Sequence, residues 1–415
     1  MQDLAVTPPL FKETVFDDPS IRDLSKVGVI DIGSNSVRLV VFDGAARSPA
    51  YFFNEKIMCG LGVGLSLNGK LNPTGRVRAI EAIARFKNLA LSMGIQELTA
   101  IATAAVRTAS DGQDFCKEVM EKTGQFIAMI SGEEEAKLSA QGVLTGWPGA
   151  YGLVCDLGGT SLELAEISNG KVGKCASSEL GPLKLMDISK KKERLEFIKS
   201  ELSDLAKSFS PRNNRLFLVG GSWRALARID MERCDHPLRV LHEYRMEKKT
   251  IKDLKHFIKD QGLENVAKQC SISGNRIMFI PYAIEVLEKL SNIFRSKDIA
   301  ISSYGIREGM LYEKMPQMLR DRDPLIEACR FAEAKDARVP GAGKALFNFV
   351  KPLFSNAKES ETRLIQAACL LNDVSWRAHP DYRHEACFDY ITRANLGGLK
   401  HSERVFLGLS LLFRY

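Results

Sequence analysis

The hydrophobic pattern of the first 140 residues alternates between short apolar runs, typical of strands, and longer stretches with helical spacing. Val27–Asp31 is an apolar run that ends in a carboxylate, and Val37–Phe42 is a second apolar run. The residues between them, Ile32–Ser36, have turn composition, so the pattern predicts a β-hairpin with glycine, serine and asparagine at its tip. Further along, Arg78–Leu91 has helical periodicity and Thr99–Thr103 indicates another strand.

A second copy of this hairpin follows. Gly152–Asp156 is again an apolar run that ends in aspartate, Leu157–Ser161 is a turn of small residues, and Leu162–Ile167 is the returning strand. The pattern therefore gives Asp31 and Asp156 equivalent positions in two copies of one unit.

A third glycine turn and a helical region complete the pattern. The apolar run from Leu216 leads into Gly220-Gly221-Ser222 and then into helical spacing over Arg224–Arg228. From about Pro316 to Tyr415 the spacing is helical with few strand signals, which predicts a C-terminal α-helical domain. Because the sequence stops within the apolar segment Val405–Phe413, we expect this domain to be truncated.

Composition narrows the class of protein. A chain of 415 residues with 45% hydrophobic and 26% charged residues is ordinary for a globular protein of several domains, and excludes a disordered chain, collagen or a coiled-coil rod. No apolar run approaches the ~18 residues of a membrane helix, and Met1–Ser20 does not resemble a secretory signal. Nine scattered cysteines without a CxxC pair indicate reduced thiols and a cytoplasmic location.

The charge balance leaves two interpretations open. The chain carries 58 basic and 51 acidic residues, a net charge of +7. This excess is either a solvated surface or a field that attracts a polyanion. The basic run Lys190–Lys192 stands beside Glu193 and Glu196 in an expected helix, so by itself it indicates an exposed helical face.

The three small-residue turns predict phosphate binding, although hairpins also use glycine for geometry alone. Glycine lets successive backbone N–H groups point into one concavity that binds phosphate oxygens, and hydroxyl or amide side chains add donors. An aspartate at each strand end suits a divalent metal that neutralises the phosphate, which makes Asp31 and Asp156 candidate ligands. The candidate phosphate-binding residues in these turns are Gly33, Ser34, Asn35, Ser36, Gly158, Gly159, Thr160, Ser161, Gly220, Gly221 and Ser222.

Five segments together resemble the exopolyphosphatase and guanosine-pentaphosphate phosphohydrolase family. In chain order they are Val29-Ile-Asp-Ile-Gly-Ser-Asn-Ser36, Ala102-Thr-Ala-Ala-Val-Arg107, Ile130-Ser-Gly-Glu-Glu-Glu-Ala136, Asp156-Leu-Gly-Gly-Thr-Ser-Leu-Glu163 and Ser303-Tyr-Gly-Ile-Arg-Glu-Gly-Met-Leu311. The resemblance covers roughly residues 26–315.

The resemblance implies an α/β fold with two actin-like (ribonuclease H-like) domains facing across a cleft. It implies domain I at residues 1–138, domain II at 139–316 and a C-terminal helical domain, related to metal-dependent His-Asp phosphohydrolases, at 317–415. Glu135 matches the family's catalytic glutamate, with Glu134 as the second choice, because Glu133, Glu134 and Glu135 are adjacent and acids are common in a first helical turn. Asp156 and Glu163 match the acidic pair that supports the metal, and Arg107 matches a phosphate-contacting arginine.

The sequence departs from the family at three positions. The family usually has glycine in place of Thr160 and threonine in place of Leu162. Asn372 replaces the histidine of the His-Asp step in the helical domain, with Asp373, His379, His384 and Glu385 nearby. We therefore expect that domain to have a structural or substrate-holding role. The glycines Gly60, Gly62 and Gly64 lack the setting of a dinucleotide fingerprint.

The predicted activity is stepwise, processive release of orthophosphate from the end of inorganic polyphosphate, with Glu135 activating water and Mg²⁺ or Mn²⁺ (and K⁺ as a further candidate ion) assisting. Lys184, Lys190–Lys192 and Arg224 are candidates for a basic track. Guanosine pentaphosphate hydrolysis, a kinase or ATPase of the wider superfamily, and a non-catalytic polyphosphate-binding or signalling protein are the alternatives. We expect a homodimer, with no specific nucleic-acid or membrane partner.

Overall fold

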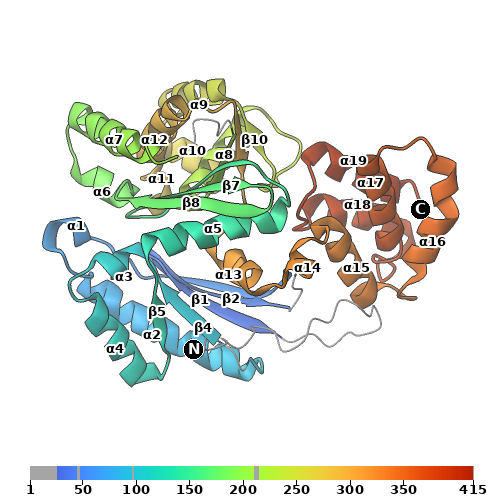
Figure 1. Ribbon diagram of the computed structural model, residues 1–415, viewed down its shortest axis with the longest axis horizontal. Coiled ribbons are helices and arrows are strands. Elements are labelled where there is room, and N and C mark those ends of the chain that lie inside the picture. The colour runs from blue at the N-terminus through green and yellow to red at the C-terminus, as the bar shows by residue number, and fades with distance from the viewer. Residues whose placement is uncertain (1–25, 44–46, 96–97, 210–214, 415) are drawn as a thin grey trace, which may run out of the picture.

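The computed structural model describes residues 26–43, 47–95, 98–209 and 215–414. The N-terminal segment Met1–Ser20 lies outside the described residues. The described chain forms two mixed sheets with helices and a separate helical domain, as Figure 1 shows.

The first sheet contains both strands of the predicted N-terminal hairpin. Its strand order is β3-β2-β1-β4-β5, with β1 and β2 antiparallel and β1 and β4 parallel. The strands are β1 (Val27–Ile32), β2 (Ser36–Phe42), β3 (Tyr51–Met58), β4 (Leu98–Ala102) and β5 (Ile127–Met129).

The second sheet repeats the order of the first and adds one strand. Its order is β10-β11-β9-β6-β7-β8, with β6 and β7 as the antiparallel hairpin and β9 parallel to β6. The strands are β6 (Gly152–Leu157), β7 (Leu162–Ser168), β8 (Lys171–Ser178), β9 (Arg215–Val219), β10 (Arg245–Met246) and β11 (Asp298–Ile301). The predicted internal repeat is therefore confirmed, with Asp31 and Asp156 near the ends of β1 and β6.

Two helices, α5 (Gly132–Gly146) and α13 (Ile306–Lys314), join the inner faces of the two sheets. One continuous core combines Val29 of β1, Val154 of β6, Val143 of α5 and Leu311 of α13. Both helices lie between the two sheets in the centre of Figure 1.

The outer faces of the sheets are covered by the remaining helices of these two halves. Against the first sheet pack α2 (Pro73–Ser92) and α4 (Gly112–Thr123), with α1 (Leu65–Asn68) and α3 (Ala104–Thr108) in the connections. Around the second sheet lie α6 (Pro182–Asp187), α7 (Lys191–Ala206), α8 (Gly221–Arg233), α9 (Lys248–Gln261), α10 (Leu263–Gln269), α11 (Gly274–Ile277) and α12 (Ile280–Ile293).

Strand alternation directs the strand-end aspartates Asp31 and Asp156 toward the shared core. Val27 and Val29 of β1 face the shared core, so Asp31 is the next residue on that face. Val154 of β6 faces the same core from the other sheet, so Asp156 follows it there. The period of two thus brings the two strand-end carboxylates onto facing surfaces.

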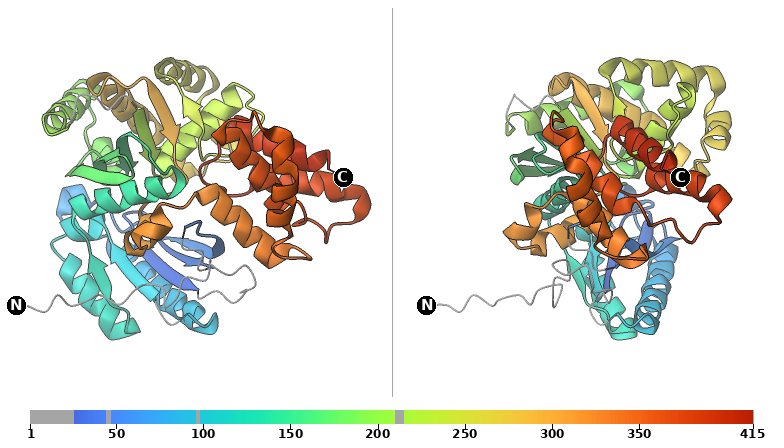
Figure 2. Two further views of the ribbon diagram at one scale, coloured as in Figure 1. Left: turned by 45° about the vertical axis from the view of Figure 1, so that its right-hand side comes forward. Right: turned by 90° about the vertical axis from the view of Figure 1, so that its right-hand side faces the viewer.

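The C-terminal region is helical, as predicted, and has a core of its own that includes Leu325, Leu364, Cys387 and Leu407. It lies to one side of the two sheets in Figure 1 and in the left view of Figure 2, and the right view looks onto it with the sheets behind. Its elements are α14 (Gln317–Arg320), α15 (Pro324–Asp336), α16 (Ala342–Val350), η2 (Lys351–Phe354), α17 (Glu359–Leu371), η3 (Pro380–Tyr382), α18 (Arg383–Arg393) and α19 (His401–Leu412). Of the expected domain boundaries, 138/139 falls inside α5 and 316/317 falls just before α14.

Two further expectations concern thiols and membranes. All nine cysteines lie in the described residues as free thiols. Within that part of the chain, no helix is both long and apolar enough to span a membrane.

Candidate active site

Glu135 differs from its two acidic neighbours by burial. Ser131 caps α5, and its hydroxyl accepts a hydrogen bond of 3.1 Å from the Glu134 backbone N–H. Glu133 and Glu134 are exposed in the first turn, whereas Glu135 is only 7% exposed. The sequence pattern left these three acids equivalent, and only the packing of α5 on the second sheet separates them.

Arg107, in α3, contacts Glu135. Its Nη1 donates to Glu135 Oε2 at 3.1 Å and to the backbone carbonyl of Ile130 at 2.8 Å. Two residues expected to act on one phosphate are therefore brought together, from α3 and the first turn of α5.

The carboxylates of the second hairpin lie side by side. Asp156 and Glu163 are directly opposite each other on β6 and β7. The Ser139 hydroxyl of α5 donates to Asp156, and the Ser177 hydroxyl of β8 donates to Glu163 Oε1 at 3.0 Å. Glu163 is 1% exposed, and among the described residues its Oε2 has no hydrogen-bond partner.

The acidic groups raise one another's pKa values. Burial raises the pKa of Glu135 to about 7; Asp156 and Asp31 add to this rise, and Arg107 opposes it. Burial also raises the pKa of Asp31 and of Asp156. The pKa of Glu163 is raised by burial and then by the charges of Glu135 and Asp156. Four carboxyl groups thus share one region that favours protons or a cation.

The tips of the two hairpins have matching backbone geometry and touch. The Gly33 N–H donates to the Ser36 carbonyl and the Gly158 N–H donates to the Ser161 carbonyl, both at 3.0 Å. A Cβ atom on Gly159 would lie 2.0 Å from Ser34 Oγ and 3.1 Å from Ser34 Cβ, so any larger residue there would require the Ser34 side chain to move. The hydroxyls of Thr160 and Ser161 are buried, with no partner among the described residues.

The third turn lies against Asp156. Gly220 has a φ of 113°, and a Cβ atom there would lie 3.1 Å from Asp156 Oδ1. Gly221 begins α8, and Ser222 is buried in its first turn. All three predicted turns are thus brought close to the acidic groups of the two hairpins.

The rejected dinucleotide glycines have a different role, which the sequence did not reveal. The carbonyl of Asn35 accepts hydrogen bonds from the backbone N–H groups of Cys59 and Gly60, and the Gly62 N–H donates to the Ser34 carbonyl at 2.7 Å. This loop therefore supports the first hairpin tip.

Sequence reasoning also missed most of a basic cluster, which we define as Arg38, Lys56, Arg224, Arg276 and Arg307. Desolvation and then the charges of the neighbouring arginines lower the pKa of Arg38 to about 10. Arg307 is 6% exposed, and its Nε lies 4.0 Å from Asp31 Oδ2. The alternation of the second predicted strand could have revealed Arg38. It is paired with Asp31 across β1 and β2, so the two side chains lie on the same face of the sheet.

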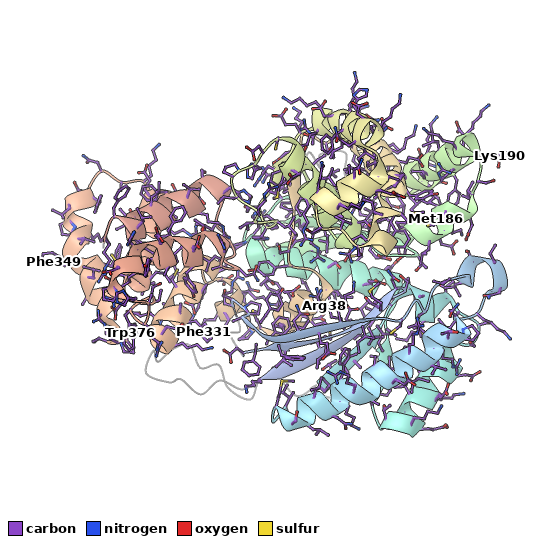
Figure 3. The ribbon with its side chains drawn as sticks, turned by 180° about the vertical axis from the view of Figure 1, so that it is seen from behind. Arg38, Met186, Lys190, Phe331, Phe349 and Trp376 are labelled. Carbon is purple, nitrogen blue, oxygen red and sulfur yellow. The ribbon has the colours of Figure 1, made fainter. Side chains whose placement is uncertain are left out.

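Of the expected basic track, only Arg224 belongs to this cluster. Lys190 lies near the outer end of α7, away from Arg38, as Figure 3 shows, and its ammonium group pairs with Glu193 at 2.8 Å. Lys184 pairs with Glu179. The run Lys190–Lys192 fits the alternative interpretation, an exposed helical face.

Arginine side chains bind Asn372 and Asp373, the two residues at which the resemblance places the His-Asp step. Arg338 donates to both carboxylate oxygens of Asp373, at 2.6 and 3.1 Å, and Arg414 donates to Asn372. His379 lies beside Asp381 instead. Across the described ranges, no three His, Cys, Asp or Glu side chains converge to hold a metal ion by themselves.

Comparisons with known proteins identify relatives of this chain. Exopolyphosphatase 1 of Mycobacterium tuberculosis is 34% identical over 143 residues, which are 34% of this chain and 42% of that protein, so the match spans less than half of the relative. Retrograde regulation protein 2 of Saccharomyces cerevisiae is 23% identical over 94% of this chain and 72% of its own length. A guanosine-5'-triphosphate,3'-diphosphate pyrophosphatase of Aeromonas hydrophila is 23% identical over 83% of this chain and 72% of its own length.

Solved structures and family models extend these findings. The crystal structure of an exopolyphosphatase from Cytophaga hutchinsonii has a TM-score of 0.62 at 21% identity, covering 72% of this chain and 99% of that one. Residues 335–415 match the exopolyphosphatase C-terminal domain. Residues 40–318, more than half of the chain, match the Ppx/GppA phosphatase family, and the chain belongs to that family.

Proposed function

We propose that this protein is an exopolyphosphatase, which removes terminal phosphate groups from inorganic polyphosphate one after another by water attack. Glu135 takes a proton from the attacking water. Arg107, the three glycine turns and the cations of the basic cluster bind phosphate oxygens and stabilise the charge that develops on them.

The raised pKa of the buried Glu135 carboxyl group is the observation that carries this proposal. A general base works best when its pKa is close to the operating pH, and burial raises the pKa of Glu135 to about 7. The side chain is held by Arg107 and lies near Asp156 and Asp31, which are next to the hairpin tips. Glu134 is exposed and lacks these surroundings.

A divalent ion, Mg²⁺ or Mn²⁺, fits the residues present. Three carboxyl groups lie together here, those of Asp31, Asp156 and Glu163, and burial raises the pKa values of the first two. Glu163 Oε2 is buried without a hydrogen-bond partner among the described residues. Mg²⁺ usually keeps several waters and takes one or two carboxylates plus substrate phosphates, so it does not require three protein ligands. When bound, the ion neutralises phosphate charge.

Polyphosphate is the substrate that the basic cluster favours. The five cations of this cluster come from both halves of the molecule and repel one another. A substrate with several adjacent negative charges relieves more of that repulsion than a single phosphate does. Guanosine pentaphosphate offers fewer adjacent phosphate groups and is the alternative substrate. We infer a homodimer and a cytoplasmic location only from the family resemblance, and K⁺ remains a further candidate ion.

A second candidate is a non-catalytic polyphosphate-binding or signalling protein. The observation that favours it is the yeast relative, whose name refers to regulation and which matches 94% of this chain. The buried carboxylates Glu135 and Glu163 favour catalysis, because a protein that only binds polyanions gains nothing from acidic groups at its binding turns.

One experiment separates these functions. Phosphate release is measured from polyphosphate and from guanosine pentaphosphate side by side, with and without magnesium. An exopolyphosphatase releases phosphate faster from polyphosphate and requires the metal. Faster release from guanosine pentaphosphate would support the alternative substrate, and binding of polyphosphate without any release would support the non-catalytic function.

A further inference from the structure

Three polar residues form a straight row across the first sheet. Asp31 of β1 is paired with Arg38 of β2, and Arg38 is paired with Lys56 of β3. Directly paired residues of antiparallel strands point to the same face, so all three side chains project toward the second half of the molecule. Since neighbouring strands are about 4.8 Å apart, the Lys56 backbone is about 10 Å from Asp31.

The alternation of β3 supports this orientation. Glu55, the residue before Lys56, projects to the opposite face, where its carboxylate pairs with Arg85 of α2 at 2.9 Å. Lys56 is therefore separated from the nearest acid of its own strand by the sheet itself. β3 is the edge strand of the first sheet, so the row ends at Lys56.

The charges that face Lys56 are almost all positive. Desolvation, followed by repulsion from Arg276 of α11, Arg38 of β2, Arg224 of α8 and Arg307 of α13, lowers the pKa of Lys56 to about 8. The acids within this cluster are Asp31 of β1 and Glu308 of α13. Lys56 lowers the pKa of Asp31 less than Arg307 and Arg38 do, and the charge of Glu308 acts on Arg307. The end of the row at Lys56 therefore has more positive than negative charges around it.

The arginines around this row differ in how many of their N–H donors already have a hydrogen-bond partner. Arg38 donates to Asn54 Oδ1 at 2.7 Å, and Arg224 donates to the Gly220 carbonyl at 3.1 Å. Arg307 is 94% buried, and its Nε and Nη1 have no hydrogen-bond partner among the described residues. The charges of Glu308 and Asp31 act on this guanidinium, but two of its N–H donors remain available to a bound anion.

We propose that Lys56 is the cation of a distal subsite, which binds phosphate groups of a polyphosphate beyond the one being removed. This inference rests on the proposed function, since it takes the hairpin tips near Asp31 and Asp156 as the place of the terminal phosphate. The row then gives the chain its direction, from Asp31 past Arg38 to the open edge at Lys56. Lys56 selects for substrate length, because a short substrate held at Asp31 ends before it.

The test measures equilibrium binding of tripolyphosphate and of a longer polyphosphate of defined length. All proteins carry Glu135→Gln so that the substrate is not consumed. Lys56→Met is compared with Lys56→Arg, which keeps a cation, and with Lys190→Met, a matched loss of an exposed lysine outside the basic cluster. We expect Lys56→Met to weaken binding of the longer chain about tenfold and that of tripolyphosphate less than twofold. Lys56→Arg and Lys190→Met retain the parental affinity.

Salt and pH provide readouts that a purely structural role of Lys56 would not change. Loss of one phosphate contact lowers the salt dependence of binding, so the slope decreases in Lys56→Met and not in Lys56→Arg. Binding by the parent weakens as the pH rises through about 8, where Lys56 loses its proton. Lys56→Arg keeps its affinity there, because arginine stays protonated.

The outcomes separate this inference from the proposed function. Equal affinity of the parent and Lys56→Met for the longer chain, or equal losses for both lengths, would overturn the distal subsite while leaving the exopolyphosphatase proposal intact. Failure of the parent to bind any polyphosphate would overturn both.

Discussion

Arg107 Nη1 lies 3.1 Å from Glu135 Oε2 and 2.8 Å from the carbonyl oxygen of Ile130. The carbonyl fixes the guanidinium, and the guanidinium in turn holds one oxygen of a buried carboxylate. Burial and the charges of Asp156 and Asp31 raise the pKa of Glu135 and Arg107 lowers it, so the value near 7 is a balance between these effects.

Arg107→Met should shift this balance. Without the guanidinium the pKa of Glu135 rises further, because Arg107 lowers it in the native chain. A base must be deprotonated to act, so the acidic limb of the pH profile of kcat/KM moves to higher pH and activity at pH 7 falls. An acidic limb that stays in place would show that Glu135 does not control it.

Glu135→Gln should remove most turnover and leave polyphosphate binding intact. The change keeps the shape of the side chain and removes the base, and general-base catalysis contributes roughly 10²–10⁴-fold. Phosphate release and equilibrium binding are measured for this variant and for Glu134→Gln. Glu134 is exposed, so its variant should remain active. The opposite pattern, with Glu134→Gln inactive, would contradict the assignment.

Asp156→Asn should raise the magnesium concentration needed for half-maximal activity, besides slowing hydrolysis. The substitution removes a negative charge next to the third turn and to Ser139. A magnesium titration of phosphate release measures the effect. Unchanged half-saturation would place the ion elsewhere.

Gly159→Ala should destabilise the fold locally. The added methyl group would lie 2.0 Å from Ser34 Oγ and 3.1 Å from Ser34 Cβ, so the Ser34 hydroxyl must rotate and the two tips must shift to accommodate it. We expect a loss of about 1–3 kcal/mol in the free energy of unfolding, as for other overpacked sites. Gly274→Ala is the control, since a methyl group there meets open space. Equal thermal stability of the two variants would mean that the tips do not meet in solution.

The hairpins were predictable because their signal is local. Each combines an apolar strand, a strand-end aspartate and a turn of small residues, and the second copy strengthened the interpretation of the first. Arg38 was in principle accessible too, since it alternates with Val37 and Leu39 on a predicted strand.

The remaining site residues were not accessible from local pattern. Glu133, Glu134 and Glu135 share one helical turn, and only the surface against which α5 packs determines which one is buried. Lys56 comes from a segment without a binding motif, and Arg307 lies in the segment Ser303–Leu311, whose resemblance to the family assigned it no role. The two residues reach Asp31 through sheet pairing and through the packing of α13. Such tertiary neighbours leave no trace in spacing along the chain.

The junction between the helical domain and the second half predicts a dependence of stability on pH. His401 of α19 bonds through Nδ1 to His236 at 2.9 Å and through Nε2 to the His242 carbonyl at 3.1 Å. Nε2 must donate to that carbonyl, so Nδ1 accepts, and protonation of Nδ1 breaks the bond. Desolvation lowers the pKa of His401 to about 4.

Because this pKa lies below the ordinary value of 6.5, the unfolded chain takes up its proton first as the pH falls. The contribution of His401 to stability is therefore complete above pH 6.5 and is lost progressively down to about pH 4. Unfolding is followed across this range for the native chain, for His401→Gln and for the exposed control His379→Gln. The difference between native chain and His401→Gln should shrink toward acid, and a constant difference would contradict the neutral bridge.

The crossing of α5 and α13 has a mechanical consequence. A Cβ atom on Gly142 would lie 2.1 Å from the Gly305 carbonyl oxygen, and one on Gly309 would lie 1.7 Å from that of Leu138, so the two backbones touch with no side chain between them. At these two points the distance between the helices is set by backbone atoms alone. Any larger residue at Gly142 or Gly309 would force α5 and α13 apart, and because both helices pack in the core that the two sheets share, the two halves of the molecule would have to shift with them.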